Sequence, residues 1–372
     1  MNKKIIFHIP YNIDTKRPSG SQIRPIRILN AFVELGYEVD TVMGYGLERK
    51  KSIKLIKDKL KQGAKYEFAY SESSTMPTLL TEKHHLPTYP FLDFGFFKFL
   101  KRNHINIGLY YRDIYWVFED YMKQISLYKR TMAIPLYRYD IWQYTRLLDV
   151  FFLQSLEMSN YIPSVSLQKK VYTLPPGCEI KPISDSVKQN QSNTKLKVFY
   201  VGGILPPFYN LQPLLEGINN TSAASLTLIC RKNEWEQTSS FYKNIGLKNV
   251  NIAHVSGSEL DSFYGEADLF AIIRKSDPYL DFALPVKLFE ALGYGLPIIT
   301  SAGTAVARFV EENNVGWIVS NANEFGKLIS YLQNNRDELM AIKQRVKQIR
   351  HQHTWSTRAE AVTKVLTQGD NL

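Results

Sequence analysis

Residues 276–301 read SDPYLDFALPVKLFEALGYGLPIITS, and this stretch constrains the fold more than any other. Proline suits the first turn of a helix and glycine its end, so Pro285 and Gly293 predict a helix over residues 285–292. The apolar run over residues 297–300 then predicts a buried strand. A helix that is followed at once by a short apolar strand is typical of a parallel α/β sheet.

Lys287 lies in the first turn of this predicted helix, where a cation is unfavourable by about 0.3–1 kcal/mol because the helix dipole is positive there. A bound anion would remove the conflict, since the ammonium and the free backbone N–H groups could bind one phosphate together. Glu290 shares a helix face with Lys287, and a carboxylate there can accept hydrogen bonds from both hydroxyls of a ribose. The pattern favours a nucleotide-phosphate site, and a surface salt bridge between the two residues is the alternative.

Outward from this stretch, strands and helices alternate in two blocks. The apolar runs predict strands over residues 4–9, 38–42, 105–111, 197–201, 226–230, 250–253 and 269–273. Helical spacing predicts helices over residues 25–36, 49–65, 211–218 and 323–350, the first starting at Pro25 and ending at Gly36. Between the blocks, LPPG at residues 174–177 and the polar run over residues 184–195 mark a linker.

This alternation predicts an α/β protein of two doubly wound, Rossmann-like domains that face each other across a cleft. The first domain would comprise residues 1–175 and the second residues 176–351. The closing helix, at about residues 352–368, would pack back on the first domain. A length of 372 residues fits two domains of ordinary size.

The composition is that of a globular protein, with 44% hydrophobic and 22% charged residues. Two cysteines, Cys178 and Cys230, exclude a disulfide scaffold and a cysteine-based zinc site, and they fit a reducing cytosol. The histidines show no metal-ligand spacing and no DxD triad occurs, so neither a metal nor another cofactor is expected. There is no signal peptide and no apolar run of about 20 residues, which predicts a soluble or peripheral protein.

Positive charge is concentrated in the first half of the chain. Of the net charge of +11, residues 1–175 carry +10, with 26 basic and 16 acidic residues. This half is therefore predicted to meet nucleic acid, a phospholipid surface or a phosphorylated substrate, and a merely solvated basic surface is the alternative. Much of the aromatic excess lies between residues 89 and 152 and is expected mostly in the core, with some rings lining a cleft or resting on a membrane.

The first loop between a strand and a helix is a second candidate phosphate site. Ser19, Gly20 and Ser21 are placed in this loop, where glycine lets backbone amides approach a phosphate without a Cβ in the way. Arg24 and Arg27 follow on the helix and could reach the same anion. Placement of both arginines on the solvated surface is the alternative.

Further polar residues follow the ends of other predicted strands. Gly203 lies just after one strand, Arg231 and Lys232 follow the next, and Arg112 with Asp113 follows a strand of the first block. The carboxyl ends of parallel strands form the edge at which open α/β sheets bind ligands. The pair Arg231–Lys232 and the pair Arg112–Asp113 could each face a ligand there. Alternatively, each pair could close a loop as a solvated or ion-paired group.

Three segments together resemble a GT-B glycosyltransferase. They are the opening strand, Gly/Ser loop and helix within residues 1–45, the motif LPVKLFEALGYGLPIITS at residues 284–301, and HTWSTRAEAV at residues 353–362. The chain is most similar to the retaining enzymes of glycosyltransferase family 4 and their relatives. The resemblance covers nearly the whole chain, and it is strongest over residues 269–320 and weakest over residues 60–175.

The resemblance implies that the second domain binds a nucleotide-sugar donor and the first domain an acceptor. It assigns the donor ribose to Glu290 and the diphosphate to Lys287. The segment just before them is expected to line the donor, and it consists of Asp281, Phe282, Ala283, Leu284 and Pro285. Phe282 stands where the family usually has a first glutamate, so the neighbouring Asp281 is the expected substitute.

The family also carries an arginine and a lysine after the first strand of the second domain, and the segment VGGILPPFYN here has neither. Arg231 and Lys232 are the predicted replacements, and Gly20, Ser21 and Gly203 would complete the donor site. The catalytic candidates are Lys287, Arg112 and Asp113, with Asp113 as the carboxylate near the acceptor hydroxyl.

The resemblance implies a metal-independent retaining transfer of a sugar from a nucleotide diphosphate to a hydroxyl of a growing glycan. The departing phosphate could itself take the acceptor proton, which would explain the lack of an obvious general base. A nucleotide-sugar epimerase of the same architecture is one alternative. A nucleic-acid-binding protein is a weaker one, because the basic residues are spread along the chain rather than gathered in a binding motif.

The basic first half further predicts a lipid-linked acceptor and an anionic membrane surface as partners, and no nucleic acid. We expect a cytoplasmic enzyme, peripheral on the inner face of the cytoplasmic membrane, in bacterial surface polysaccharide or lipopolysaccharide biosynthesis. Residues 49–65 would supply the electrostatic contact and the aromatic residues of 89–121 the interfacial one. A wholly soluble enzyme with a basic surface is the alternative.

Overall fold

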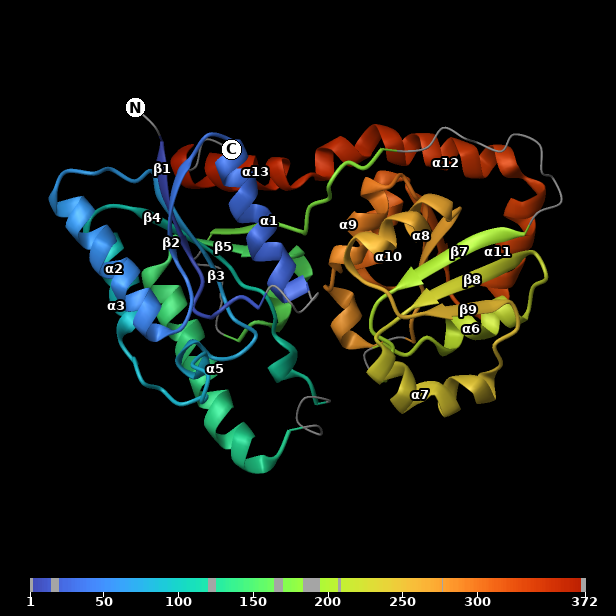
Figure 1. The fold of residues 1–372 in the computed structure, drawn as a ribbon, viewed down its shortest axis with the longest axis horizontal. Coiled ribbons are helices and arrows are strands. Elements are labelled where there is room, and N and C mark those ends of the chain that lie inside the picture. Colours follow the sequence, from blue (N-terminus) through green and yellow to red (C-terminus); the bar gives the residue numbers. More distant parts are fainter. Residues whose placement is uncertain are drawn as a thin grey trace. The chain divides into compact units, whose positions relative to one another are not determined.

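The computed structural model describes residues 3–14, 20–119, 125–163, 170–182, 195–206, 209–275 and 277–368 of the chain. The chain forms two compact units (Figure 1). The first consists of Met1–Pro175 together with Trp355–Leu372, and the second of Pro176–Thr354. The polypeptide thus leaves the first unit at the LPPG segment and returns to it at the last helix.

The first unit contains a six-stranded parallel sheet in the order β2-β1-β3-β4-β5-β6. Its strands are β1 Lys4–His8, β2 Glu38–Val42, β3 Phe68–Glu72, β4 Asn106–Tyr110, β5 Val150–Leu153 and β6 Lys170–Thr173. Strands β3 and β5 are buried along their whole length, as expected of a sheet covered on both faces. The chain reverses its direction of winding between β1 and β3, so the carboxyl ends of these strands form the topological switch point.

Helices cover both faces of this sheet (Figure 1). They are α1 Gly20–Glu34, α2 Gly46–Lys61, α3 Leu92–Arg102, α5 Leu127–Leu147 and α13 Trp355–Gln368. The last helix packs against α1 and β4, with Trp355, Val362 and Leu366 in the same core cluster as Phe32 of α1.

Helix α1 begins earlier than the sequence predicted. Pro25 was expected at its start, but the helix begins at Gly20 and Pro25 lies inside it. Pro25 has no N–H for the carbonyl of Ser21, and that carbonyl accepts the hydroxyl of Tyr11 instead, at 3.1 Å. Gly20 and Ser21 therefore belong to the first helical turn rather than to a loop, whereas Ser19 lies outside the described residues.

The second unit contains another six-stranded parallel sheet, in the order β12-β11-β10-β7-β8-β9. Its strands are β7 Leu196–Val201, β8 Ala224–Ile229, β9 Val250–Ala253, β10 Leu269–Ile272, β11 Ile298–Ser301 and β12 Gly316–Val319. The switch point lies between β7 and β10. Two doubly wound parallel sheets confirm the predicted fold class.

The helices of the second unit also lie on both faces of their sheet. They are α6 Gln212–Asn219, α7 Lys232–Ile245, α8 Leu260–Glu266, α9 Val286–Gly293, α10 Ala305–Asn313, α11 Ala322–Asn334 and α12 Arg336–Ile349. The single helix predicted over residues 323–350 was wrong. Asn335, with φ −122° and ψ 62°, leaves helical geometry and separates α11 from α12.

Strand β12 was not predicted because it has four residues and only one of them is buried. Gly316 at its start faces β11 so closely that a Cβ would lie 1.8 Å from the carbonyl oxygen of Ile298. The strand therefore depends on this glycine. The polar run over residues 184–195 lies outside the described residues except for Lys195.

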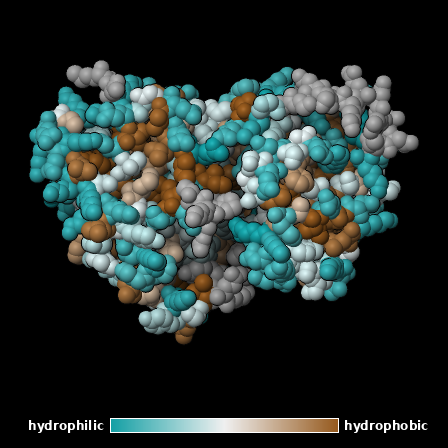
Figure 2. All heavy atoms as spheres, viewed as in Figure 1, coloured by the Kyte–Doolittle hydropathy of each residue, from teal (hydrophilic) through white to brown (hydrophobic). Residues whose placement is uncertain are grey.

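The aromatic excess belongs mainly to the core of the first unit. Phe94, Phe96, Phe97, Tyr110 and Trp116 are each at most 4% exposed. These rings cannot rest on a membrane interface, which corrects the prediction for much of residues 89–121; Tyr121 lies outside the described residues. On the face shown in Figure 2, hydrophobic side chains are interspersed with hydrophilic ones.

Candidate functional site

The carboxyl edge of the second sheet gathers polar residues from four strands. Gly203 follows β7, Arg231 follows β8, Arg274 follows β10, and Ser301 ends β11. Helices α9 and α10 start near the last two strands and point their positive poles at this edge. The edge therefore combines the switch point of the sheet with two helix N-termini, which together favour an anionic ligand.

The predicted pair on α9 lies at this edge. Lys287 is the second residue of the helix, and its Nζ donates to Oε2 of Glu290 at 2.6 Å. The salt bridge that the sequence offered as an alternative is therefore present. Both side chains remain partly exposed, at 30% and 26%, so a ligand can still reach them.

Tyr264 of α8 holds the Glu290 carboxylate in place by a hydrogen bond. Its hydroxyl donates to Oε2 of Glu290 at 3.0 Å, and its ring stacks on Tyr294 with centroids 4.4 Å apart. Burial and the neighbouring Glu290 raise the pKa of Tyr264 well above its ordinary value, so it remains a donor at physiological pH. The hydrogen bonds from Tyr264 and Lys287 both go to Oε2, and within the described residues none is recorded to Oε1 of Glu290.

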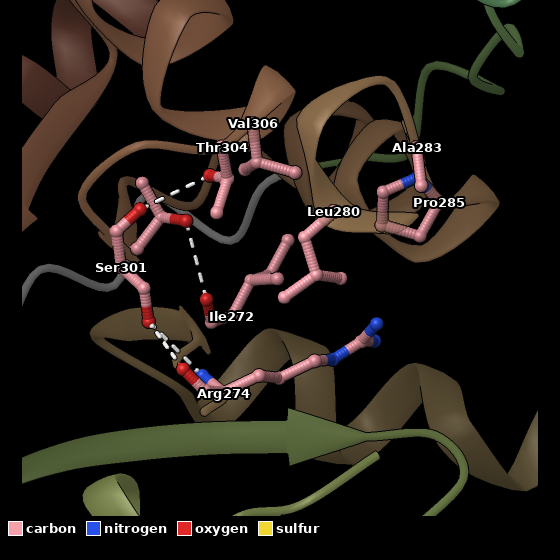
Figure 3. A pocket seen from close by; sticks show the side chains of 9 residues that line it. Ile272, Arg274, Leu280, Ala283, Pro285, Ser301, Thr304 and Val306 are labelled. Carbon is pink, nitrogen blue, oxygen red and sulfur yellow. Dashed lines mark hydrogen bonds between the residues drawn. The ribbon is translucent and has the colours of Figure 1, made fainter. Parts of the chain in front are cut away.

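A pocket lies between the carboxyl ends of β10 and β11 and the first turns of α9 and α10 (Figure 3). Its lining residues are Ile272, Arg274, Leu280, Ala283, Pro285, Thr300, Ser301, Thr304 and Val306. Thr304 caps α10 by accepting the N–H of Ala307 at 3.0 Å and donates to the carbonyl of Ser301 at 3.0 Å. These bonds fix the polar wall of the pocket.

The segment before α9 divides between this pocket and the core. Ala283 and Pro285 line the pocket, and their contact with a donor stays a prediction. Phe282 is fully buried against Tyr279, and Leu284 is 8% exposed. The structure corrects the prediction for the Phe282 side chain, because an apolar ring that completes the core cannot also contact a donor.

The recorded contacts of Asp281 and Arg231 are with residues other than Lys287 and Glu290. The carbonyl of Asp281 accepts a hydrogen bond from Arg308 of α10. Arg231 precedes α7, pairs with Glu234 at 2.5 Å and has a 58% exposed side chain, so it has a solvated ion-paired role. Its neighbour Lys232 is exposed.

Gly203 and Arg274 both lie close to the ring of Tyr209. A Cβ on Gly203 would lie 3.1 Å from this ring, and the guanidinium of Arg274 lies 4.7 Å from its centre. Arg274, Tyr264 and Tyr294 were not predicted as site residues from the sequence. The position of Arg274 directly after an apolar strand is the signal that could have identified it.

The carboxyl edge of the first sheet holds a buried charge network. Glu72 at the end of β3 is fully buried and binds both Arg24 of α1 and Arg112, the latter at 2.6 Å. Arg112 also donates to the hydroxyl of Tyr11 at 2.9 Å, and the guanidinium of Arg24 lies 3.3 Å above the ring of Tyr110. Arg24 is 2% exposed, so both earlier placements, on the surface or at a phosphate, were wrong.

Asp113 lies just beyond this network and is partly exposed. Its Oδ1 accepts the N–H of Tyr115 at 3.1 Å. Arg27, one turn after Arg24, is half-buried. The structure thus places Asp113 after β4 as predicted, while Arg112 is held inside the network with Glu72.

Among the described residues, no group of three or more His, Cys, Asp and Glu side chains is arranged to hold a metal ion. None of the described helices is both long enough and apolar enough to span a bilayer.

Comparison with known proteins identifies this architecture. Residues 211–364 match the family described as glycosyl transferase-like. No functionally curated protein matches the chain in sequence. Among solved structures, sucrose-phosphate synthase from Thermosynechococcus elongatus has a TM-score of 0.66 at 14% identity, covering 98% of this chain and 99% of that one.

Two further structures are similar over the same length. HepE from Anabaena, solved with UDP, has a TM-score of 0.65 at 14% identity and covers 98% of this chain and 100% of that one. WaaG, a glycosyltransferase involved in lipopolysaccharide biosynthesis, has a TM-score of 0.59 at 13% identity, with coverage of 98% and 100%. The family match and the shared two-unit fold agree: the chain has the GT-B fold, and its residues 211–364 are similar to the glycosyl transferase-like family.

Proposed function

We propose that the chain transfers a sugar from a nucleoside-diphosphate sugar to a hydroxyl of a lipid-linked glycan, with retention at the transferred carbon. The donor would bind at the carboxyl edge of the second unit. The observation that carries the proposal is the hydrogen-bonded set of Tyr264, Glu290 and Lys287 beside two helix N-termini. HepE, which shares the fold, was solved with UDP-glucose, which supports a donor of this class.

Donor binding would exchange the partner of Lys287. In the structure its ammonium neutralises Glu290. A diphosphate at the start of α9 would draw the ammonium away, while Tyr264 would continue to hold the Glu290 carboxylate in place for the ribose hydroxyls. Glu290 would then keep hydrogen bonds from Tyr264 and the ribose hydroxyls, and the diphosphate would take over the positive charge of Lys287.

The chemical step requires stabilisation of the departing nucleoside diphosphate. Lys287 and the free N–H groups at the start of α9 would oppose the charge that develops on its leaving oxygen. In a front-face reaction that oxygen takes the proton of the acceptor hydroxyl as the bond to the sugar breaks. Retention follows from the resemblance to family 4. Asp113 on the first unit is the proposed contact of the acceptor, because its carboxylate is partly exposed at the end of β4.

Thermal-shift measurements with UDP, GDP, ADP, CMP and TDP test the donor class. A ligand at about 100 times its dissociation constant should add about 2.7 kcal/mol of stability. At least one nucleotide should therefore raise the melting temperature, and no shift with any of them would contradict the proposal. An epimerase would convert its nucleotide sugar without an acceptor, and a nucleic-acid-binding protein would bind generic DNA at physiological salt.

We further propose that the acceptor is reached at an anionic membrane, at the inner face of the cytoplasmic membrane. Helix α2 exposes Lys50, Lys51 and Lys54 together with Leu47 and Leu55, which are 54% and 63% exposed. Exposed lysines near anionic lipid contribute about 1 kcal/mol each, and leucines beside them can enter the headgroup layer. WaaG, a protein of similar fold, is involved in lipopolysaccharide biosynthesis, which supports this class of acceptor.

The structure narrows the contact surface that the sequence suggested. Arg49 is 2% exposed and binds Asp93 at 2.9 Å, so it is not part of the basic surface. Phe91, at 78% exposed, is an aromatic residue of the 89–121 segment that remains available to an interface.

Vesicle co-sedimentation tests the membrane proposal. The protein should bind vesicles that contain anionic lipid more than neutral ones, and added salt should weaken the binding. The triple change of Lys50, Lys51 and Lys54 to Gln should abolish most of it. The matched control changes exposed lysines of the second unit, Lys243, Lys248 and Lys327, to Gln. If both triple variants lost vesicle binding equally, the binding would depend only on the net charge of the protein, and α2 would not be the contact surface.

A further inference from the structure

Arg274 is anchored at the switch point of the second sheet. Oγ of Ser301 accepts the N–H of Arg274 at 3.0 Å and donates to its carbonyl, also at 3.0 Å. This double contact ties the residue after β10 to the end of β11. Its side chain extends along the pocket on the side opposite Thr304 and Val306 (Figure 3).

The charge of Arg274 is not neutralised by a carboxylate. None of the ion pairs recorded between described residues includes it, and its Nε is buried without a hydrogen-bond partner. Its guanidinium instead lies 4.7 Å from the centre of the Tyr209 ring and is hydrogen-bonded to the Tyr200 side chain, so Nε is the donor that lacks a partner. A buried N–H donor without a partner costs about 1–3 kcal/mol, so an acceptor that reached this N–H would be favoured.

Three other cations of this edge already have acceptors. Lys287 pairs with Glu290, Arg231 with Glu234, and Arg308 donates to the carbonyl of Asp281. Arg274 differs from them because both its position at the switch point and its unused donor point to a ligand. The first turns of α9 and α10 lie at the same pocket, and they add favourable potential for an anion.

We propose that Arg274 binds the diphosphate of the donor and thereby replaces the arginine and lysine that the segment after β7 lacks. This inference rests on the proposed function and names the residue that distinguishes a diphosphate from a bare nucleoside. A guanidinium can bind two phosphate oxygens at once, which holds the leaving group in one orientation. Arg231, which the sequence suggested for this role, keeps its surface pair with Glu234.

Isothermal titration calorimetry on the full chain tests the assignment. UDP, GDP and ADP are titrated first, followed by the nucleoside of whichever binds, and by inorganic pyrophosphate. Arg274→Gln should weaken the nucleoside diphosphate and pyrophosphate about tenfold or more, because charge-assisted hydrogen bonds are lost, and should change nucleoside affinity less than about twofold. Arg274→Lys should fall between the variant and the wild type.

Two matched variants control for charge and place. Lys275→Gln removes the same charge from the exposed neighbouring residue, and Arg231→Gln removes it from the residue first suggested. Both should retain diphosphate affinity within about twofold. Circular dichroism and the melting temperature show whether each variant is folded. If Arg274→Gln does not fold, the diphosphate affinity of Arg274→Lys tests the same assignment.

The possible results decide between the inference and the proposed function. Unchanged diphosphate affinity in Arg274→Gln, or an equal loss of nucleoside affinity, overturns the inference. Failure of the wild type to bind any nucleotide overturns the proposed function, and the pyrophosphate titration then separates the two. Pyrophosphate binding that depends on Arg274 supports the anion site, and binding that does not depend on it, or no binding at all, overturns this inference as well.

Discussion

The two sheets present opposite kinds of carboxyl edge. In the first unit, Glu72 lies between Arg24 and Arg112, and all three side chains are at most 9% exposed. In the second unit, Lys287 and Glu290 are partly exposed and Arg274 has no carboxylate partner in the part of the chain that the structure describes. The same sheet architecture thus produces one edge whose charged groups are buried and paired and one edge whose charged groups stay partly exposed.

The closed edge stabilises the fold at the switch point of the first sheet. Burial raises the pKa of Tyr11 to about 12 and that of Tyr70 well above its ordinary value, so both tyrosines stay neutral hydrogen-bond partners. Because these tyrosines carry no charge, the negative charge that pairs with both guanidiniums comes from Glu72. The network joins α1 to the ends of β3 and β4, and we expect its loss to affect folding before activity.

The largest effect is expected from Glu72→Gln. This change leaves two buried guanidiniums without their shared carboxylate, and breaking a buried pair typically costs about 3–5 kcal/mol. Urea unfolding followed by circular dichroism should show a much lower midpoint. The control is Glu38→Gln, because Glu38 pairs with Lys4 at 2.8 Å on the surface and its loss should cost at most about 1 kcal/mol. Equal shifts in the two variants would contradict the closed edge.

At the open edge, Glu290→Gln should affect ligand binding rather than folding. Hydrogen bonds to a charged acceptor contribute about 1.5–3 kcal/mol, so nucleotide affinity should fall about 10- to 100-fold. Calorimetry with the nucleotide found by thermal shift measures the change. Glu311→Gln, which removes an exposed carboxylate at the end of α10, is the control. An unaltered affinity in Glu290→Gln would remove the ribose assignment.

Tyr264→Phe sharpens the same comparison with a smaller change. It removes the hydroxyl that holds Oε2 of Glu290 and retains the ring stacked on Tyr294. One hydrogen bond contributes about 1 kcal/mol, so nucleotide affinity should fall about five-fold with little loss of stability. Tyr331→Phe, which removes an exposed hydroxyl bonded to Glu338 at 2.7 Å, should leave affinity unchanged. A loss of stability without a loss of affinity would make Tyr264 purely structural.

The smallest effect concerns His8, at the end of β1 in the first unit. It contacts Ser71 at 2.8 Å and Asp93 at 3.0 Å, and burial lowers its pKa although Asp93 opposes the shift. The unfolded chain then takes up the proton first, so stability is present above the ordinary histidine pKa and is lost as the pH falls through it. Between pH 7.5 and 6 this contributes a loss of up to about 0.8 kcal/mol.

The variant His8→Gln isolates this contribution. Its free energy of unfolding should fall less than that of the wild type between pH 7.5 and pH 6, as urea titrations at both pH values would show. His84→Gln, which changes an exposed histidine, should behave as the wild type does. A pH dependence in His8→Gln that equals the wild type would show that His8 titrates as freely in the folded protein as in the unfolded chain.

Local patterns determined much of the molecule. The strands over residues 38–42 and 250–253 have the predicted bounds, and Pro285 stands directly before α9, which carries Lys287 and Glu290 on one face. Gly36 has a φ of 85° just after α1, as a helix-ending glycine requires. These features depend on hydrophobic periodicity and on the backbone preferences of proline and glycine, which act within one or two turns.

Only the tertiary structure decided which polar residues are partners. Arg24 is buried because β3 brings Glu72 beneath it from 48 residues away, and Tyr264 reaches Glu290 from 26 residues away. Helix α1 includes Pro25 because Tyr11, on a different segment, binds the carbonyl that the proline leaves free. Arg274 stands out only once Arg231 and Lys287 are seen to be paired. Such pairings follow from the order of the strands in each sheet, and residue type and spacing along the chain do not contain that order.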